Sequence, residues 1–402
     1  MKKLSLGVED VTQILQEGYT YVDKTGFALH MIEEGRSCII IRPKGFGKTL
    51  FLSTLEQILK GNKELFQGTE IYKSSYDWPE YLIFRVDFSQ IDASSSIAFE
   101  NGLKAELTQF AVSNGVPANE SWVVAQLISV MSNVSEKTGK EIVVLVDEFD
   151  APIINNIQNP HNLQAVNIAE DHRQLIAFFL KCVTRSVDNP RVKFAFAFGL
   201  NKFAWIGGDV VHMKNIEMDP EYATLMGFTE AEVKTCFGDH IRSIAQERSL
   251  QHKRNVSEEA ILGEIRQWYF GYRFTVKEVT VYNPESTLRY LRTKKATNYW
   301  YSSRNRSALI DAAARDNMPL GLQDSTVGLR LQPSDFNITR LRYVDVRSLM
   351  YYNGYLTIRK YHPERQWYDL DFPNKEAREA YKNTYLLRNR VKAHHYENNN
   401  KN

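Results

Sequence analysis

The residues with the clearest chemical potential form a short glycine-containing loop that ends in a lysine and a threonine. At the start of a helix, backbone N–H groups point outward with the positive end of the helix dipole, so they can hold phosphate oxygens. Gly47 lets the backbone approach phosphates closely, Lys48 supplies a charge to the β- and γ-phosphates of ATP, and the Thr49 hydroxyl can ligate Mg²⁺. The predicted nucleotide-binding residues are Pro43, Lys44, Gly45, Phe46, Gly47, Lys48 and Thr49.

This loop matches the phosphate-binding pattern G-x-x-x-x-G-K-[ST] at every fixed position except the first. Arg42 stands where the pattern has glycine, and Pro43 follows it with a φ that its ring fixes. The first turn of the loop is therefore expected to differ in shape from the usual one. Taken alone, the segment has a second interpretation as an ordinary strand-to-helix turn that contains glycine.

An acidic pair follows the most apolar segment of the chain, residues 142–146. A buried strand there would deliver Asp147 to the Mg²⁺ shell and place Glu148 to activate the attacking water. An acidic strand end is common by itself. Two such motifs, each at the carboxyl end of an apolar strand, are much less common, and ligands bind at that edge of a parallel sheet. The sequence therefore predicts that Lys48 and Asp147 converge on one pocket for Mg·ATP.

Further candidates lie around the apolar segment that ends at Phe198. Asn201 could sense the γ-phosphate there, although an asparagine after a strand is often only a turn former. With Lys48 and Glu148 it completes the predicted catalytic set. Candidates for an arginine finger, each with the alternative role of a solvated charge on a helix, are Arg173, Arg185 and Arg191.

The elements that position these residues alternate between apolar strands and helices. Strands are expected at 38–41, 81–88, 142–146 and 194–198, with helices between them and a polar stretch over 155–172. This alternation predicts an α/β fold with a parallel sheet and helices on both faces. After about residue 220 helical patterns dominate, beginning at Thr229 and Ser257. The predicted regions are a P-loop ATPase core (1–220), a helical lid (221–340), a small aromatic-rich unit (341–391) and a disordered tail (392–402).

The bulk properties are those of a globular protein without a membrane span. The 402 residues carry a net charge of +2, which is not the charge of a protein that coats nucleic acid. No apolar run reaches the roughly 20 residues that cross a bilayer. Three widely spaced cysteines argue against a disulfide framework and indicate a reducing, cytoplasmic location.

These motifs and their neighbours resemble the AAA-ATPase-like family of bacteria, whose members often carry a C-terminal PD-(D/E)XK nuclease domain. The resemblance implies a P-loop NTPase core of the additional-strand type, with strand order 5-1-4-3-2, followed by a helical lid. It implies nucleotide roles for Lys48, Thr49, Asp147 and Glu148, and the family likewise has Arg-Pro where this chain has Arg42-Pro43. The matching segments are Tyr21-Val22-Asp23-Lys24-Thr25, Arg42-Pro43, Phe46-Gly47-Lys48-Thr49, Val146-Asp147-Glu148-Phe149-Asp150-Ala151-Pro152, Gly227-Phe228-Thr229, Trp268-Tyr269-Phe270-Gly271-Tyr272-Arg273-Phe274, Tyr282-Asn283-Pro284, Asn353-Gly354-Tyr355-Leu356-Thr357 and Phe372-Pro373-Asn374.

Two features depart from the family pattern. Phe198-Gly199 stands where family members usually have Thr-Gly, which puts the sensor in doubt. A nuclease of that class needs an Asp and a Glu-x-Lys on adjacent strands, and the Glu-x-Lys at 232–234 lies in a helical, capped segment. We therefore expect no nuclease domain in this chain.

Three functions remain open at this stage. The leading one is Mg²⁺-dependent ATP hydrolysis that rearranges the helical region. The second is a switch or scaffold that binds ATP or ADP with little turnover. The third is a nucleic-acid-handling ATPase that works with a separate nuclease, for which basic groups such as Arg289, Arg292, Lys294 and Lys295 are weak support, since they equally suit a solvated helix face. The oligomeric state and the source of any arginine finger stay open.

Overall fold

The computed structural model describes residues 1–118, 120–157, 162–184, 191–203, 212–300, 329–342 and 344–383. A five-stranded parallel sheet lies at its centre, in the order β2-β3-β4-β1-β5. Read from its other edge this is 5-1-4-3-2, so the predicted fold class is confirmed. The strands are β1 (Cys38–Ile41), β2 (Leu82–Asp87), β3 (Ile142–Asp147), β4 (Val192–Gly199) and β5 (Lys214–Asn215).

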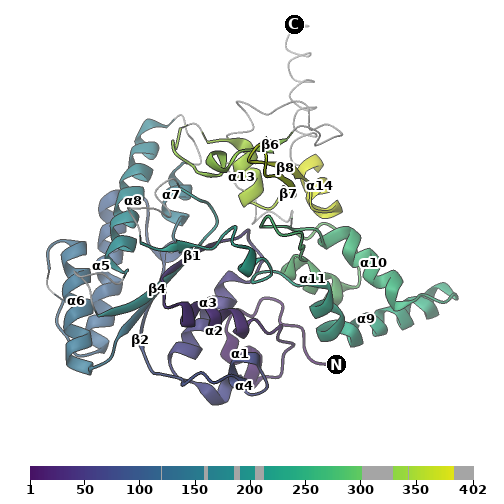
Figure 1. The fold of residues 1–402 in the computed structure, drawn as a ribbon, viewed down its shortest axis with the longest axis horizontal. Coiled ribbons are helices and arrows are strands. Elements are labelled where there is room, and N and C mark those ends of the chain that lie inside the picture. Colours follow the sequence, from purple (N-terminus) through teal and green to yellow (C-terminus); the bar gives the residue numbers. More distant parts are fainter. Residues whose placement is uncertain are drawn as a thin grey trace, which may run out of the picture.

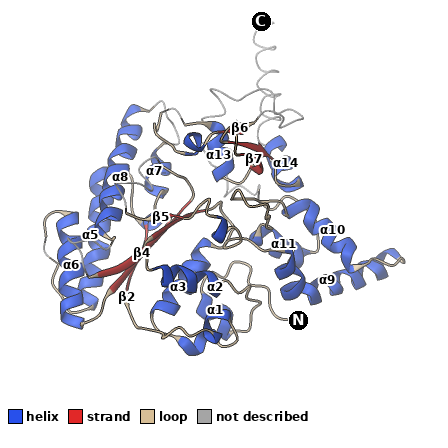
Figure 2. Ribbon diagram, viewed as in Figure 1, coloured by secondary structure: helices blue, strands red, loops and turns tan. Residues whose placement is uncertain are grey.

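Helices cover both faces of this sheet, as Figures 1 and 2 show. Because successive side chains of a strand point to opposite faces, β1 sends Ile39 and Ile41 into one core and Cys38 and Ile40 into the other. The first core packs against α5 (Ser96–Ser113), α6 (Val123–Thr138), α7 (Ala151–Asn156) and α8 (Leu163–Cys182). The second packs against α1 (Val11–Gln16), α2 (Thr25–Glu34), α3 (Lys48–Leu59) and α4 (Glu70–Lys73).

One segment differs from its sequence prediction. The polar stretch expected over 155–172 is wrong, because α8 already begins at Leu163. Asn162 caps this helix by accepting a hydrogen bond from a backbone N–H of its first turn. His172 is fully buried on the inner face of α8, with Nδ1 3.1 Å from the carbonyl oxygen of Pro152. A buried, hydrogen-bonded histidine takes an apolar position in the helical repeat, which a count of polar residues does not reveal.

The helical region that follows has a core cluster of its own. It consists of α9 (Glu230–His252), α10 (Glu258–Tyr269) and α11 (Pro284–Thr293), which extend away from the sheet in Figure 1. The predicted capping box of α9 is confirmed, since Thr229 and Glu232 exchange both hydrogen bonds. No helix in the described ranges is long and apolar enough to cross a bilayer.

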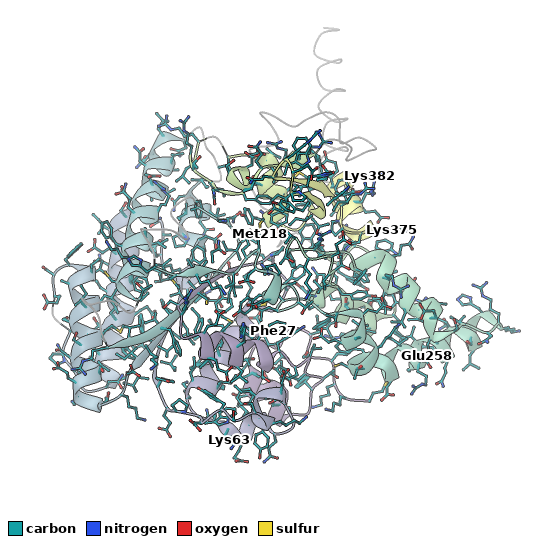
Figure 3. All side chains as sticks on the ribbon, viewed as in Figure 1. Phe27, Lys63, Met218, Glu258, Lys375 and Lys382 are labelled. Atoms are coloured by element: carbon teal, nitrogen blue, oxygen red, sulfur yellow. The ribbon has the colours of Figure 1, made fainter. Side chains whose placement is uncertain are left out.

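A small C-terminal unit packs over one end of the sheet. It contains an antiparallel sheet in the order β6-β8-β7, and its apolar residues belong to the same core as α5 to α8. Side chains around Met218 fill the space between this unit and the sheet (Figure 3). The predicted boundaries at 220 and 340 stay predictions, and the predicted tail 392–402 lies outside the described residues. The elements are β6 (Arg330–Leu331), α13 (Val346–Tyr352), β7 (Thr357–His362), β8 (Trp367–Asp371) and α14 (Lys375–Tyr381).

A buried carboxylate joins this unit to the helical region. Glu376 of α14 is fully buried and accepts hydrogen bonds from the Ser286 hydroxyl of α11 (3.0 Å) and from the backbone N–H groups of Tyr299 and Trp300 (2.8 and 3.0 Å). Burial raises the pKa of Glu376 from 4.5 to about 7, against the lowering effect of these hydrogen bonds. The folded protein therefore binds the proton of the Glu376 carboxyl group more tightly than the unfolded chain does. The stability that this proton contributes is lost as pH rises through about 7.

We expect the Glu376→Gln variant to show a weaker loss of stability with rising pH than the wild type. Glutamine keeps the acceptor oxygen and does not ionise, so its advantage in free energy of unfolding should grow by about 2 kcal/mol between pH 5.5 and pH 8.5. Urea denaturation at both pH values measures this. Glu379→Gln, on the same helix and more exposed, is the matched control. Parallel pH profiles for wild type and Glu376→Gln would contradict the prediction.

Candidate functional site

The predicted phosphate loop joins the end of β1 to the start of α3. Gly45 and Gly47 both adopt left-handed backbone conformations, with φ of 78° and 87°. At Gly47 a side chain would meet no other atom, so glycine is required there by the backbone conformation alone. At Gly45 an added methyl group would also lie 3.0 Å from a carboxylate oxygen of Glu285 on α11. The backbone N–H of Glu285 donates a hydrogen bond to the Gly45 carbonyl at 3.3 Å.

Arg42 turns away from the cavity and into the protein. Its guanidinium donates to the carbonyl oxygens of Ile41 and Glu217, each at 2.8 Å, and lies 4.4 Å from the ring centre of Phe274. Only 1% of Arg42 is exposed. The residue that replaces the first glycine of the pattern therefore ties the loop to the segment after β5, which gives a physical reason for an arginine at this position.

Aromatic residues support the loop from behind. The Phe46 ring makes edge-on contacts with Tyr272 (4.9 Å between ring centres) and Phe274 (5.3 Å). A methyl group at Gly354, in the C-terminal unit, would lie 3.2 Å from Cβ of Pro43. The loop is thus held between its own cavity and two segments that follow it by more than 220 residues in the chain.

Lys48 lies between the loop and the acidic pair. Its ammonium donates to the Arg42 carbonyl (3.1 Å) and lies 3.6 Å from a carboxylate oxygen of Glu148. The Lys48 side chain is 5% exposed, while that of Glu148 is 24% exposed on the cavity wall. The two sequence motifs, 100 residues apart, therefore meet at one place.

The acidic pair is electrostatically unusual. Burial, together with the neighbouring Glu148 charge, raises the pKa of Asp147 to about 6, while a hydrogen bond from Thr49 and the charge of Lys48 oppose this shift. Glu148 has a φ of 46°, a left-handed conformation that is uncommon for a non-glycine residue and is often found at functional sites. Thr49 and Asp147 together offer hydroxyl and carboxylate oxygens, the donors that Mg²⁺ prefers.

Asn201 does not line the cavity. Its side-chain amide donates to Asp150 at 2.9 Å, and the backbone N–H groups of Leu200 and Asn201 donate to the same carboxylate at 2.9 and 2.8 Å. Burial raises the pKa of Asp150. These bonds fasten the end of β4 to the turn that follows Glu148. Of the three arginine candidates, Arg173 pairs with Glu170 and Arg191 with Glu136, away from the cavity lining, and Arg185 lies outside the described residues.

The loop and Glu148 form part of a cavity of about 400 Å³. Its other walls come from residues 5–9, 20–22 and 24 of the N-terminal segment, from residues 225–228 and from α11. This volume is in the range of small-molecule and cofactor sites. The cavity therefore lies between the sheet domain and the helical region, which both contribute to it.

Two cavity residues were missed as site residues at the sequence level. Arg289 of α11 lines the cavity and pairs with Glu285 at 2.7 Å, whereas the sequence placed it in a basic group on a helix face. Lys24 lines it as well, and its ammonium donates to Thr224 and to Glu232 of α9, at 2.8 and 2.6 Å. No local pattern could identify either, because Lys24 contacts residues 200 and 208 positions away and Arg289 shares the cavity with the distant phosphate loop.

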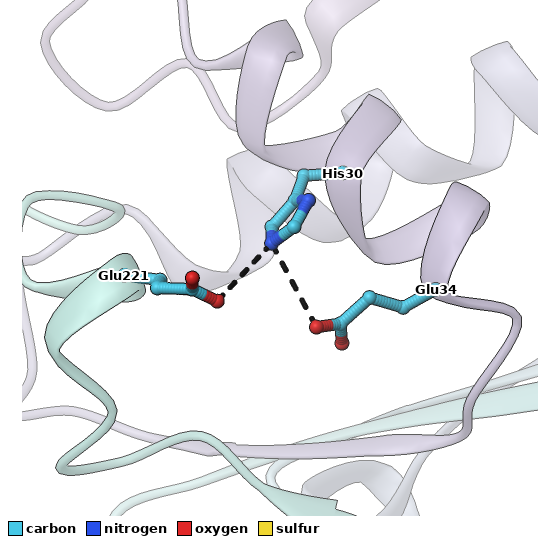
Figure 4. Close-up of side chains that lie close together, drawn as sticks. All are labelled: His30, Glu34 and Glu221. Atoms are coloured by element: carbon cyan, nitrogen blue, oxygen red, sulfur yellow. Dashed lines mark hydrogen bonds and ion pairs between the residues drawn. The ribbon is translucent and has the colours of Figure 1, made fainter.

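One further group of possible metal ligands does not line this cavity. His30, Glu34 and Glu221 have donor atoms within 4.8 Å of one another (Figure 4), and this is the one such trio within the described ranges. The Lys214 ammonium lies 3.0 Å from Glu34 and 3.0 Å from Asp219. Because Lys214 already neutralises Glu34, and Glu221 lies 3.4 Å from the His30 ring, we interpret the group as an ion-pair network that joins α2 to the segment after β5.

A comparison with protein-family models agrees with these motifs. A family model described as "Predicted AAA-ATPase" matches residues 5–207, which include the loop, the acidic pair and Asn201. A protein of Azotobacter chroococcum mcd 1, described as "Uncharacterized protein in vnfD 5'region", is 27% identical over 393 residues, covering 96% of this chain and 70% of that protein. Among solved structures, the Aeropyrum pernix ORC2 protein (ADPNP-ADP complexes) matches with 12% identity and a TM-score of 0.30, over 62% of this chain and 70% of that one.

Proposed function

Since this chain belongs to the predicted AAA-ATPase family, whose model covers half of it, we propose that it binds Mg·ATP in this cavity and hydrolyses it to ADP and phosphate. One observation carries the proposal: the Lys48 ammonium lies 3.6 Å from the Glu148 carboxylate on the wall of a cavity that could hold a nucleotide. The cavity wall therefore carries both a cation that can bind phosphates and a carboxylate that can activate water.

The phosphate chain would lie over residues 43–49. The Lys48 ammonium contacts the carbonyl of Arg42 and the carboxylate of Glu148. Phosphate oxygens could replace these partners while the N–H groups at the start of α3 bind the same oxygens. Thr49 and Asp147 would hold Mg²⁺ with their side-chain oxygens. The bound cation neutralises charge on the β- and γ-phosphate oxygens.

Hydrolysis would use Glu148 as the general base. Water attacks the γ-phosphorus, the bond from that phosphorus to the bridging oxygen breaks, ADP leaves, and the water proton passes to the Glu148 carboxylate. For Asn201 the contacts support a positioning role through Asp150, two residues beyond Glu148. Sensing of the γ-phosphate by Asn201 would require its amide to leave Asp150.

The decisive experiment measures phosphate release from ATP by the purified chain, with and without Mg²⁺. Mg²⁺-dependent release that saturates with ATP supports the proposal. The absence of both ATP binding and phosphate release under these conditions would overturn it.

Arg289 is proposed as the cation that the helical region contributes to the nucleotide. We expect Arg289→Ala to weaken Mg·ATP binding about tenfold, because it removes one charge-assisted contact to phosphate. Calorimetric titration measures this. The exposed Arg292 of the same helix provides the matched control, Arg292→Ala. Equal ATP affinity in the wild type and both variants would remove Arg289 from the site.

The switch alternative keeps one observation in its favour. The Asn201 amide is engaged by Asp150, and none of the described residues 200–203 after β4 lines the cavity as a polar sensor. Tight ATP binding with no detectable phosphate release would favour a switch over a hydrolase.

The nucleic-acid alternative has less support than the sequence suggested. Arg289 lines the cavity and Lys294 pairs with Glu247, so two of the basic residues on this segment are otherwise engaged. That alternative, a separate partner nuclease and the oligomeric state remain untested predictions. The cytoplasmic location also remains a prediction, and it is supported by Cys38, Cys182 and Cys236, which form no disulfide with one another.

A further inference from the structure

The cavity extends well beyond the phosphate loop. Helix α3 runs along it from Lys48 to Thr54, a distance of about 9 Å at the rise of an α-helix. At this far end the Tyr21 hydroxyl lies 3.4 Å from the Thr54 hydroxyl, so the N-terminal segment closes the cavity there. A triphosphate held by the loop would leave this end for the rest of the ligand.

Part of the cavity wall is apolar. Leu6 and Val22 of the N-terminal segment and Phe228 line the cavity and pack against the same core cluster as Leu288 of α11. Apolar walls contributed from two sides suit a flat heteroaromatic ring, which needs few but well-placed polar contacts.

Thr20 supplies a polar group among these residues. It lines the cavity, is 4% exposed, and is fixed by its backbone N–H, which donates to the Lys3 carbonyl at 2.8 Å. Its hydroxyl oxygen has no hydrogen-bond partner. Buried hydroxyls nearly always have one, and an unpaired one destabilises the fold. Rotation about the Cα–Cβ bond exchanges the hydroxyl and methyl positions of threonine between staggered wells, so the hydroxyl can reach a ligand in the cavity.

We infer that Thr20 is a specificity-determining residue whose hydroxyl hydrogen-bonds the base of the bound nucleotide. The inference rests on the proposed function, because it requires the phosphates of the same ligand to occupy the loop at 43–49. A base bound there would supply the partner that the Thr20 hydroxyl lacks.

The test compares ligands with and without a base. Thr20→Val keeps the shape of the side chain and removes the hydroxyl. With Mg²⁺ present, calorimetric titration should show ATP affinity reduced about tenfold and the affinity for inorganic tripolyphosphate unchanged. The ligand-free variant should melt at a higher temperature than the wild type, because the unpaired hydroxyl is gone. Thr20→Ser, which keeps a hydroxyl, should bind ATP within about threefold of the wild type.

Each contrary result has a distinct meaning. Equal losses for ATP and tripolyphosphate, or a lower melting temperature, would assign Thr20 a structural role. If the loss disappears with 2′-deoxy-ATP or 3′-deoxy-ATP as the ligand, the contact is to the ribose and the base assignment is wrong. ATP binding that is unchanged by Thr20→Val ends the inference but leaves the proposed function intact. A wild type that binds neither ATP nor tripolyphosphate ends both.

Discussion

The Glu148→Gln variant is expected to bind Mg·ATP as tightly as the wild type and to release phosphate at least about a hundredfold more slowly, since a general base typically contributes two to four orders of magnitude. Glutamine fills the same space but cannot take a proton from water. It also no longer pairs with the Lys48 ammonium, which lies 3.6 Å from the wild-type carboxylate, so ATP binding should not suffer. Phosphate release under saturating ATP, with binding measured separately, resolves the two effects.

A matched carboxylate away from the cavity controls for this substitution. Glu136→Gln removes an acid that pairs with Arg191 at 3.6 Å and is largely exposed, so phosphate release should be unchanged. Wild-type turnover in Glu148→Gln would mean that another group activates the water, or that water attacks without a base from this chain.

The Lys48→Ala variant is expected to lose most of its affinity for Mg·ATP, by about a hundredfold or more, because a charge-assisted contact to two phosphates disappears from a nearly dry site. The Lys48 side chain is 5% exposed, so water does not readily replace it. Its removal also leaves Glu148 without its cationic partner, and that carboxylate then repels the incoming phosphates. Calorimetric titration with ATP and with tripolyphosphate measures the loss.

The control for Lys48→Ala is Lys60→Ala at the end of the same helix. Lys60 is 43% exposed and pairs with Glu56, so ATP affinity should be unaffected. Undiminished ATP binding by Lys48→Ala, in a variant whose circular dichroism matches the wild type, would place the phosphates elsewhere.

The parts of the site that could be predicted from the sequence are formed by residues that are consecutive in the chain. A strand, a turn with Gly47 and a helix that starts at Lys48 are specified locally, as is the strand that delivers Asp147. The α/β class followed from the same alternation. The strand order came from the family resemblance. Strand β5 could not be identified from periodicity, because it has only two residues and neither is apolar. The family and the strand order are confirmed, whereas the assigned roles of individual site residues stay predictions.

The remaining parts depend on contacts that no local pattern encodes. Arg289 and Lys24 reach the cavity only because the helical region folds back over the N-terminal segment. Thr20 looks like any small polar residue until its hydroxyl is found without a partner. The Asn201 amide could equally have faced the cavity or Asp150, and tertiary packing decided for Asp150. Local sequence largely determines secondary structure, whereas the direction in which a functional side chain points depends on its tertiary contacts.

Phe46 packs against Tyr272 and Phe274, and Pro43 packs against Gly354. These contacts have a consequence for transfer of the loop between proteins. The side of the phosphate loop that faces away from the cavity packs against residues far along the chain. A protein that received residues 5–207 alone would therefore lack the side chains that support the loop. Exchange of either part for a foreign one would remove the aromatic contacts that support the loop.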